Sequence, residues 1–532
     1  MSSTAVDPSG VHDAPRPLAR VVGLILVLTA AAVLGANAVG STTIVFAVVM
    51  LVAVLALING RPVVWIALAI TVVWTSRLLT TAGWAPRFLD FADFPLVLVA
   101  FLFAGVRFLS SDRRLPPAQR KILRWLLAFS VVIALSWAFK GLAEPQRLVA
   151  GLVLAAEPFL LLIAVLITPM TARERKRLVI LTSILLCVQV VFSLAQYPFA
   201  AHPDEVKGTL LGTGAGHHVS AGGAALGFLI LARQRVPKTF LLAYGAAALF
   251  VMIASDAKQV MVVLPLALLV LGVSGRKRSG SAVSLIGGLL AGVLMAGAAF
   301  YALVTYQASS TALTFADRSF ENRTGKFAVA EAVWDDVTAT VPTALLGLGP
   351  GQSVSRFSFL TTPDLLKEGS PVTLIGLSQS EGADRYQGIA IGGPLTVNSS
   401  FISAQCSALG VLGDYGLLGL FVFGGLIWAV LGALRKAGDR RLRSSALASW
   451  ALLLPLSVAF DWLEQPPFTL AVALITGLAL RGPGNLDQAH GTSSGALPES
   501  PVPPVATRSV VGTSSSEPSP KPRRDHDPHD HD

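Results

Sequence analysis

The sequence has 532 residues, of which 53% are hydrophobic and 14% are charged, and its formal net charge is +10. Soluble globular domains carry roughly 25% charged residues, so this composition excludes an ordinary soluble enzyme and indicates a membrane protein. The positive charge does not predict nucleic-acid binding, because the basic residues lie in short segments between apolar runs and not on one face of a folded domain.

Apolar runs of about 15–24 residues recur along the chain, and this length matches a bilayer core of about 30 Å. The sequence therefore predicts an all-α fold, a polytopic transmembrane bundle of about fourteen spans, with the lipid bilayer as its partner. The predicted spans are 19–38, 42–59, 62–79, 91–109, 122–138, 148–168, 178–198, 213–232, 239–254, 259–273, 282–304, 406–434, 445–460 and 467–481.

The positions of lysine and arginine test the predicted number of spans, because these residues are enriched in the cytoplasmic loops of membrane proteins. They cluster in the even-numbered connections, as in "RERKR" at 173–177 and "RKR" at 276–278, and are sparse in the odd-numbered connections. We therefore predict a multi-pass protein of the cytoplasmic (inner) membrane with both termini in the cytoplasm. Residues 1–18 form a short N-terminal tail, and residues 482–532, rich in Ser, Pro, Gly and charge, form a disordered C-terminal tail.

The stretch "FVMIASDAKQVMVVLPL" at 250–266 places Asp256 and Lys258 between two apolar runs. Each run holds only about 15 or 16 residues, roughly 23 Å of helix, so the turn is expected to lie below the outer membrane surface. Irregular backbone at that depth persists only when it is buried in protein or lines a watery cavity. Lys258 is therefore a candidate functional residue, and two alternatives stay open: an amine that reaches the interface, and an ion pair with Asp256.

Two further sets of polar residues lie inside a span or at its entrance. Glu157 lies inside the sixth predicted span, where the adjacent Pro158 frees a backbone carbonyl. His217 and His218 follow a glycine-rich stretch at the start of the eighth span, and a histidine with its usual pKa suits proton transfer. For both sets, a structural role as hydrogen-bonded polar groups is the alternative to catalysis.

Residues 305–405 are predicted to form one large extracytoplasmic loop between the eleventh and twelfth spans. Within it, "ENRTGKFAVAEAVWDDVTATVP" predicts an amphipathic helix that Pro342 ends. The apolar face of this helix is expected to contain Phe327, Ala330, Trp334 and Val337. Arg323 opens the helix, where an arginine beside unpaired N–H groups can bind phosphate; a solvated helix face is the alternative.

The sequence predicts no metal site. The two cysteines, Cys187 and Cys406, have no paired spacing and are interpreted as small core residues. The histidines of the C-terminal "RRDHDPHDHD" alternate with aspartate in a tail predicted to be disordered, which gives them no fixed ligand geometry.

Several motifs follow one another in an order that resembles the O-antigen ligase and polysaccharide polymerase superfamily. They are "GTGAGHHVSAGG", "SDAKQ", "NRTGKFAVAEAVWDDV", "LGLGPGQ" and "VNSSFISAQCSALGVLGDYGLLGL". The shared region would cover 208–430, between an N-terminal bundle at 19–207 and C-terminal spans at 431–481. The family has an arginine and a tryptophan in the loop helix, a glycine-rich turn, and a histidine–asparagine pair before the next span. The matching residues are Arg323, Trp334, Gly347, Gly349, Gly351, Asn398, Gly416 and Gly419.

This resemblance implies glycosyl transfer on the outer face of the membrane, without a metal or a cofactor. The donor would be a glycan on undecaprenyl diphosphate, and the acceptor a glycan or another surface group. The diphosphate leaving group develops negative charge during transfer, which preplaced cations stabilise. Lys258 and Arg323 would bind the diphosphate, with Asp256 and Asn398 in supporting roles.

The sequence departs from the family pattern at two positions. Lys258 stands where ligases usually place an arginine, and lysine binds phosphate without the bidentate fork. Val397 replaces the histidine before Asn398, so the proton acceptor is expected among other residues. The candidates are His217, His218 and Glu157.

Two other functions remain open from the sequence. A flippase that exports lipid-linked oligosaccharide would also need cations that face a diphosphate, and a purely structural assembly subunit would share the topology. Transporters are often built from repeated halves. The loop at 305–405 has no counterpart in the first half of the chain, which favours glycosyl transfer by a polymerase or a ligase.

Overall fold

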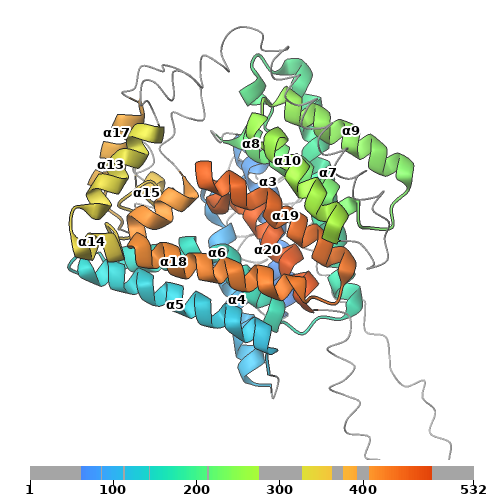
Figure 1. Ribbon diagram of the computed structural model, residues 1–532. Helices are drawn as coiled ribbons and strands as arrows, with labels where there is room; N and C mark the ends of the chain where they lie inside the picture. Colours follow the sequence, from blue (N-terminus) through green and yellow to red (C-terminus); the bar gives the residue numbers. More distant parts are fainter. Residues whose placement is uncertain are drawn as a thin grey trace, which may run out of the picture. The chain divides into compact units, whose positions relative to one another are not determined.

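The computed structural model describes eight stretches of the chain (Figure 1). They are residues 61–85, 87–111, 114–142, 144–211, 215–274, 326–361, 376–391 and 406–481. All of them belong to Met1–Pro483, the larger of two compact units; the smaller unit, Gly484–Asp532, lies outside the described residues. Within the described stretches the secondary structure is entirely helical, which confirms the predicted all-α class.

The helices are numbered in chain order, and the 3-10 helices carry the letter η. The first half contains α3 (Pro62–Thr81), η2 (Arg87–Phe91), α4 (Asp93–Leu109), α5 (Pro117–Phe139), α6 (Pro145–Ile167), α7 (Ala172–Gln196), η3 (Tyr197–Phe199), η4 (Pro203–Glu205), α8 (Gly216–Leu231), α9 (Lys238–Ala254) and α10 (Lys258–Ser274). The second half contains α13 (Lys326–Thr338), α14 (Val341–Leu346), α15 (Arg356–Leu360), α17 (Glu381–Ile391), α18 (Ser407–Arg435), α19 (Arg440–Ala459), η5 (Trp462–Glu464) and α20 (Pro466–Arg481).

Five helical segments in the described residues are long and apolar enough to cross a membrane: α3, α5, α6, α18 and the run Ala172–Phe199. Four shorter helices, α8, α9, α10 and α20, are also apolar. These segments agree with the prediction of a membrane protein. The predicted spans at 19–38, 42–59 and 282–304 lie outside the described residues, so the total of about fourteen spans stays a prediction.

Prolines and capping residues set where several helices begin. α3, α5 and α6 each begin with a proline, whose fixed φ and missing N–H suit the first turn. α7 begins with a capping box in which Thr171 and Glu174 satisfy each other's backbone N–H groups. Residues 255–257 separate α9 from α10, which confirms the predicted turn around Asp256 and Lys258.

The connections that are rich in Lys and Arg lie at one end of the helix bundle, which we call the basic end. There Arg61 Nη1 lies 3.7 Å from Glu174 Oε1, and Arg175 Nη2 lies 3.4 Å from Asp439 Oδ2. Other arginines donate to main-chain carbonyls at helix C-termini: Arg233 to Leu271, Arg443 to Ser274, and Arg481 to Val165 and Thr168. Even-numbered connections that are far apart in the sequence therefore meet, as the alternation of loop charges predicts.

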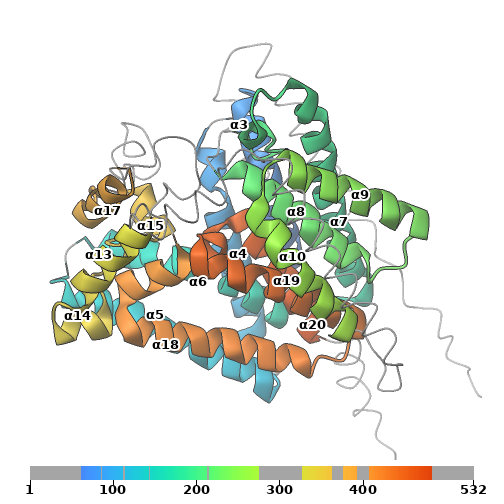
Figure 2. The ribbon, with the colours of Figure 1, turned by 45° about the horizontal axis from the view of Figure 1, so that its top comes forward.

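The opposite end carries residues 326–361 and 376–391, the described part of the chain between α10 and α18, and we call it the loop end. Figures 1 and 2 show α13, α14, α15 and α17 gathered beside the start of α18. α14 packs against α18 and the end of α5, and α15 packs against α6. α5 and α18 run side by side in both views, and the Ser136 hydroxyl of α5 donates to the Asp414 carbonyl of α18 at 2.8 Å.

The loop helix α13 buries a different face from the predicted one. Val329, Val333 and Val337 are fully buried, against a cluster that includes Tyr386 of α17 and Leu412 of α18. Of these three valines, only Val337 belongs to the predicted face. Two other residues of the predicted face, Phe327 and Trp334, are about half exposed (47% and 50%). The four-residue valine spacing selects the buried stripe, and the larger aromatic side chains, which favoured the other face in the sequence, point away from it.

Candidate functional site

A glycine-rich turn at 347–353 is bound to a buried aspartate of α18. The backbone N–H groups of Gly351, Gln352 and Ser353 donate to the Asp414 carboxylate at 3.0, 3.2 and 2.9 Å. The Ser353 hydroxyl donates to the same carboxylate at 2.6 Å, and the Gly349 N–H donates to the Asp414 carbonyl at 3.1 Å. Asp414 is fully buried, so these donors replace the water that would otherwise solvate its charge.

Two glycines of the family pattern make this contact sterically possible. Gly347 has φ +77° and Gly416 has φ +68°, in the left-handed region that side chains avoid. A Cβ on Gly347 would lie 2.5 Å from the Asp414 carbonyl carbon. A Cβ on Gly416 would lie 2.5 Å from the Leu345 carbonyl carbon. Gly416 also kinks α18, so the turn and the kink fit together only without side chains.

The turn leads directly into α15 and delivers Arg356 to the interior of the bundle. Ser355 caps α15 by accepting from the Ser358 N–H. Arg356 Nη1 lies 3.4 Å from Glu157 Oε2, at the middle of α6, and the guanidinium carbon lies 4.9 Å from the centre of the Phe94 ring. The backbone N–H of Arg356 donates to the Glu464 carboxylate. One arginine therefore joins α4, α6 and η5.

More charged groups surround this arginine at the loop end. Asp93, in the first turn of α4, is buried and interacts with both Arg356 and Arg77. Arg77 Nη1 lies 2.9 Å from Asp90 Oδ2. Buried charges need opposite charges nearby, and the Arg77–Asp90 pair together with the charge interactions of Asp93 connects α3, η2, α4 and α15.

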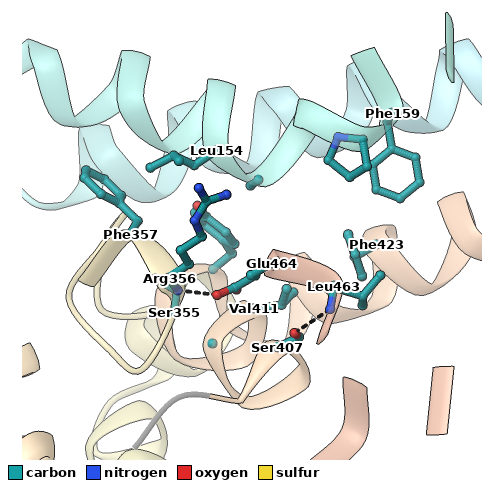
Figure 3. A pocket seen from close by; sticks show the side chains of 14 residues that line it. Leu154, Phe159, Ser355, Arg356, Phe357, Ser407, Val411, Phe423, Leu463 and Glu464 are labelled. Carbon is teal, nitrogen blue, oxygen red and sulfur yellow. Dashed lines mark hydrogen bonds between the residues drawn. The ribbon is translucent and has the colours of Figure 1, made fainter. Parts of the chain in front are cut away.

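A cavity of about 40 Å³ lies beside Arg356 and Glu464 (Figure 3). Figure 3 shows Arg356 between Glu464 and the α6 helix, with Leu154 and Phe159 on the α6 side and Val411 and Phe423 on the α18 side. The cavity is lined by Leu154, Ala155, Pro158, Phe159, Ser355, Arg356, Phe357, Ser407, Gly410, Val411, Tyr415, Phe423, Leu463 and Glu464. Most of these residues are apolar, so the two charged side chains are the chemically distinctive part of the wall.

Burial changes the acidity of Glu464, which lies between α19 and α20. Removal of its carboxyl group from water raises its pKa well above the usual value, although the hydrogen bond from the Arg356 N–H acts in the opposite direction. A carboxyl with a raised pKa accepts a proton more readily than an ordinary glutamate, which is a property of general bases.

A second buried arginine holds another part of the loop against α6. Arg147 Nε donates to Glu144 at 2.6 Å, and Arg147 Nη2 donates to the Ser378 carbonyl at 2.8 Å. Burial alone would raise the pKa of Glu144, but the hydrogen bond from Ser378 and the charge of Arg147 outweigh it and lower this pKa. The ionised Glu144 thus ties the stretch before α17 to the start of α6.

The predicted site residues lie in three places of the fold. Glu157 belongs to the site around Arg356. His217 and His218 stand at the start of α8 with ring centres 3.8 Å apart. One turn further along α8, Gly222 lies directly against the Trp462 ring of η5, so the histidines lie at the loop end.

Lys258 and Asp256 occupy the turn between α9 and α10. Lys258 Nζ lies 3.1 Å from Asp256 Oδ2, which is the ion pair that the sequence left as one alternative. The two side chains are 38% and 39% exposed, so this pair is only partly withdrawn from solvent. Arg323 and Asn398, the remaining predicted residues, lie outside the described residues, as does Val397.

Sequence reasoning missed Arg356, Glu464, Asp93 and Asp414. Arg356 and Glu464 are 108 residues apart, and no local pattern joins them. Asp414 offered a signal, because it is an acid inside a predicted span, and such residues are functional or structural candidates by default. Glu464 offered a weaker signal, because it is an acid in a short connection between two predicted spans.

The described residues contain no group of three or more His, Cys, Asp or Glu side chains placed to hold a metal ion. Cys187 and Cys406 do not form a disulfide with each other, and the buried Cys406 thiol donates to the Val458 carbonyl at 3.0 Å. Comparison with known protein families finds no family that matches the chain, and comparison with curated proteins finds no match either.

Proposed function

We propose that this protein transfers a glycan from a lipid diphosphate donor, such as an undecaprenyl-diphosphate-linked glycan, to a glycan or another surface acceptor. One observation carries the proposal. Arg356, on the long segment between α10 and α18, enters the bundle beside an apolar cavity and lies between the carboxylates of Glu157 and Glu464. A cation and a proton acceptor at one cavity are the two groups that this reaction needs.

Arg356 is proposed to stabilise the leaving group. When the glycosidic carbon–oxygen bond to the diphosphate breaks, its electron pair stays on the diphosphate, which gains negative charge. A guanidinium group has five N–H donors, and among the described residues Arg356 uses one of them, toward Glu157. The other donors suit phosphate oxygens, which arginine binds in a bidentate manner.

Glu464 is proposed to take the proton of the acceptor hydroxyl as the new glycosidic bond forms. It lines the cavity, whereas Glu157 lies behind Arg356 and holds it in place. The raised pKa of Glu464 suits this role. The proton acceptors proposed from the sequence alone are His217 and His218, at the same end of the bundle, and Glu157.

The order of motifs and the contact between their glycines support an arrangement like that of the O-antigen ligase superfamily. In this proposal the protein spans the inner membrane about fourteen times, with the loop end outside and both termini in the cytoplasm. Lys258 and Arg323 would then bind the diphosphate near the outer surface, before it reaches Arg356.

Reconstitution tests the proposal. The protein in liposomes is supplied with an undecaprenyl-diphosphate-linked oligosaccharide and a glycan acceptor, and product is separated by gel electrophoresis. The wild type is expected to release undecaprenyl diphosphate and to lengthen the acceptor. Arg356→Ala is expected to lower the rate about 100- to 1,000-fold, as for loss of one preplaced donor, and Arg356→Lys to retain part of the activity.

The matched control is Arg385→Ala, which removes an exposed arginine of α17 that pairs with Asp336. This variant is expected to transfer glycan at the wild-type rate. Wild-type protein that moves the intact donor between leaflets without transfer would instead be a flippase. If Arg356→Ala transfers glycan as fast as Arg385→Ala, Arg356 does not stabilise the leaving group.

A further inference from the structure

Two buried carboxyl groups behind Arg356 each have an oxygen that receives no hydrogen bond from the described part of the chain. They are Asp93 on α4 and Glu157 on α6, which pack side by side. Asp93 is 3% exposed and Glu157 is 2% exposed, so water cannot solvate them. The atoms without a donor among the described residues are Asp93 Oδ1 and Glu157 Oε1. A buried polar atom in this state needs a physical explanation.

A single proton would satisfy both atoms. The two carboxyl groups are close enough to hydrogen-bond to each other once one of them is protonated. If both were ionised, two acceptors would face each other and two like charges would repel in a medium of low polarity. One proton removes the repulsion and turns the contact into a charge-assisted hydrogen bond.

The surrounding charges favour this proton. Arg356 acts on both carboxyl groups, and Arg77 acts on Asp93 from α3. Arg77 is paired with Asp90 of η2, and Glu464 of η5 reaches Arg356 through its backbone N–H. With Arg77 paired to Asp90, Arg356 is the remaining cation near the pair among the described residues, and it also faces Glu464. A shared proton limits the pair to one negative charge and avoids a further excess of negative charge around Arg356.

We infer that Asp93 and Glu157 share one proton in the resting protein and act as a positioning pair for Arg356. This inference rests on the proposed function for its consequence. When the pair loses its proton at alkaline pH, a second negative charge appears beside Arg356. The pair then competes with the donor diphosphate for the guanidinium group, so transfer declines as pH rises.

Infrared difference spectroscopy of the detergent-solubilised protein tests the shared proton without any substrate. A protonated carboxyl group absorbs in the carbonyl region, apart from ionised carboxylates and amides. The wild type is expected to show this band at neutral pH. Asp93→Asn and Glu157→Gln are each expected to remove the same band, because either amide donates a hydrogen bond to the remaining carboxylate and the proton is no longer needed.

The control is Asp336→Asn, an aspartate of α13 that pairs with Arg385 outside this cluster, and it should leave the band unchanged. Loss of the band in Glu157→Gln alone would assign the proton to Glu157 and overturn the shared pair. A band that survives both substitutions would overturn it as well. If a variant does not fold, the wild-type band itself decides, because its absence at neutral pH contradicts the inference.

The pH profile of transfer tests the consequence. The wild-type rate is expected to fall about tenfold for each pH unit above the apparent pKa of the pair. Glu157→Gln mimics the protonated glutamate permanently, so the pH profile of its remaining activity should lose this decline. An unchanged decline in Glu157→Gln would overturn the positioning role. Wild-type protein that transfers no glycan at any pH would contradict the proposed function, whereas the infrared result would still decide the proton.

Discussion

The two ends of the bundle differ in the partners of their arginines. At the basic end, besides the ion pairs of Arg61 and Arg175, the arginines Arg233, Arg443 and Arg481 donate to main-chain carbonyls where helices end. At the loop end, the arginines Arg77, Arg147 and Arg356 pair with carboxylates. The first arrangement satisfies the orphan carbonyls and the dipoles of helix C-termini. The second holds charged side chains away from water, where another anion can replace one partner.

This difference separates a structural role from a chemical one for the same side chain. An arginine on a backbone carbonyl binds a group whose position is fixed by the helix. An arginine on a carboxylate belongs to an exchangeable ion pair, since a phosphate offers the same geometry as a carboxylate. Substitution of Arg356, the paired arginine beside the cavity, is therefore expected to affect catalysis, whereas substitution of an arginine bound to a helix C-terminus at the basic end is expected to affect only stability.

The largest effect is expected from Glu464→Gln. Glutamine keeps an oxygen that can accept from the Arg356 N–H but cannot take a proton, so the transfer rate should fall about 100- to 10,000-fold. The measurement is the initial rate of acceptor lengthening in liposomes. Glu381→Gln, at the exposed start of α17, is the matched control and should keep the wild-type rate.

The pH dependence sharpens the same prediction. Glu464 must be ionised to accept a proton, and its pKa is raised, so the rate should climb with pH above the range of an ordinary glutamate, about 4.3. Glu464→Gln should abolish this rise in the residual activity. An acidic limb that is unchanged in Glu464→Gln would assign the proton to another group, with His217 and His218 as the first candidates.

An intermediate effect is expected from Asp414→Ala, which tests whether the loop end depends on its buried acid. The substitution leaves the N–H groups of Gly351, Gln352 and Ser353 without an acceptor, at a cost of about 3 kcal/mol or more in the free energy of unfolding. Asp414→Asn keeps an acceptor oxygen and should cost less. Thermal unfolding in detergent and proteolysis of residues 326–361 measure the effect; wild-type behaviour of Asp414→Ala would contradict it.

The smallest effect is expected at the basic end, from Arg443→Met. Methionine keeps much of the side-chain packing but loses the donors to Ser274 and Ala437, so unfolding should become easier by about 1 kcal/mol. The rate of transfer per folded molecule should not change. If Arg443→Met lost as much transfer activity as Arg356→Ala, the proposed difference between the two ends would be wrong.

Local patterns in the sequence predicted the features that depend on nearby residues. The apolar runs predicted the start of α3 at Pro62 but began five and three residues after the starts of α5 and α6, at Pro117 and Pro145. Loop charges predicted that distant basic connections meet. The acid inside the sixth span marked Glu157 as a candidate. The partner of Glu157 could not be predicted from local patterns, because Arg356 is 199 residues away in the sequence. Its approach to Glu157 depends on how the turn at 347–353 docks. The same limit explains the wrong face of α13, since tertiary packing on Tyr386 and Leu412 selected the valines.

The kink at Gly416 has a consequence for how the chain enters a membrane. α18 has 29 residues, roughly 44 Å of helix at 1.5 Å per residue, which exceeds a hydrocarbon core of about 30 Å. Residues 417–434 contain no charged side chain and alone measure roughly 27 Å. This half alone is therefore long enough to cross most of the hydrocarbon core. We expect Asp414 to be solvated until the glycine-rich turn docks and brings its own N–H groups.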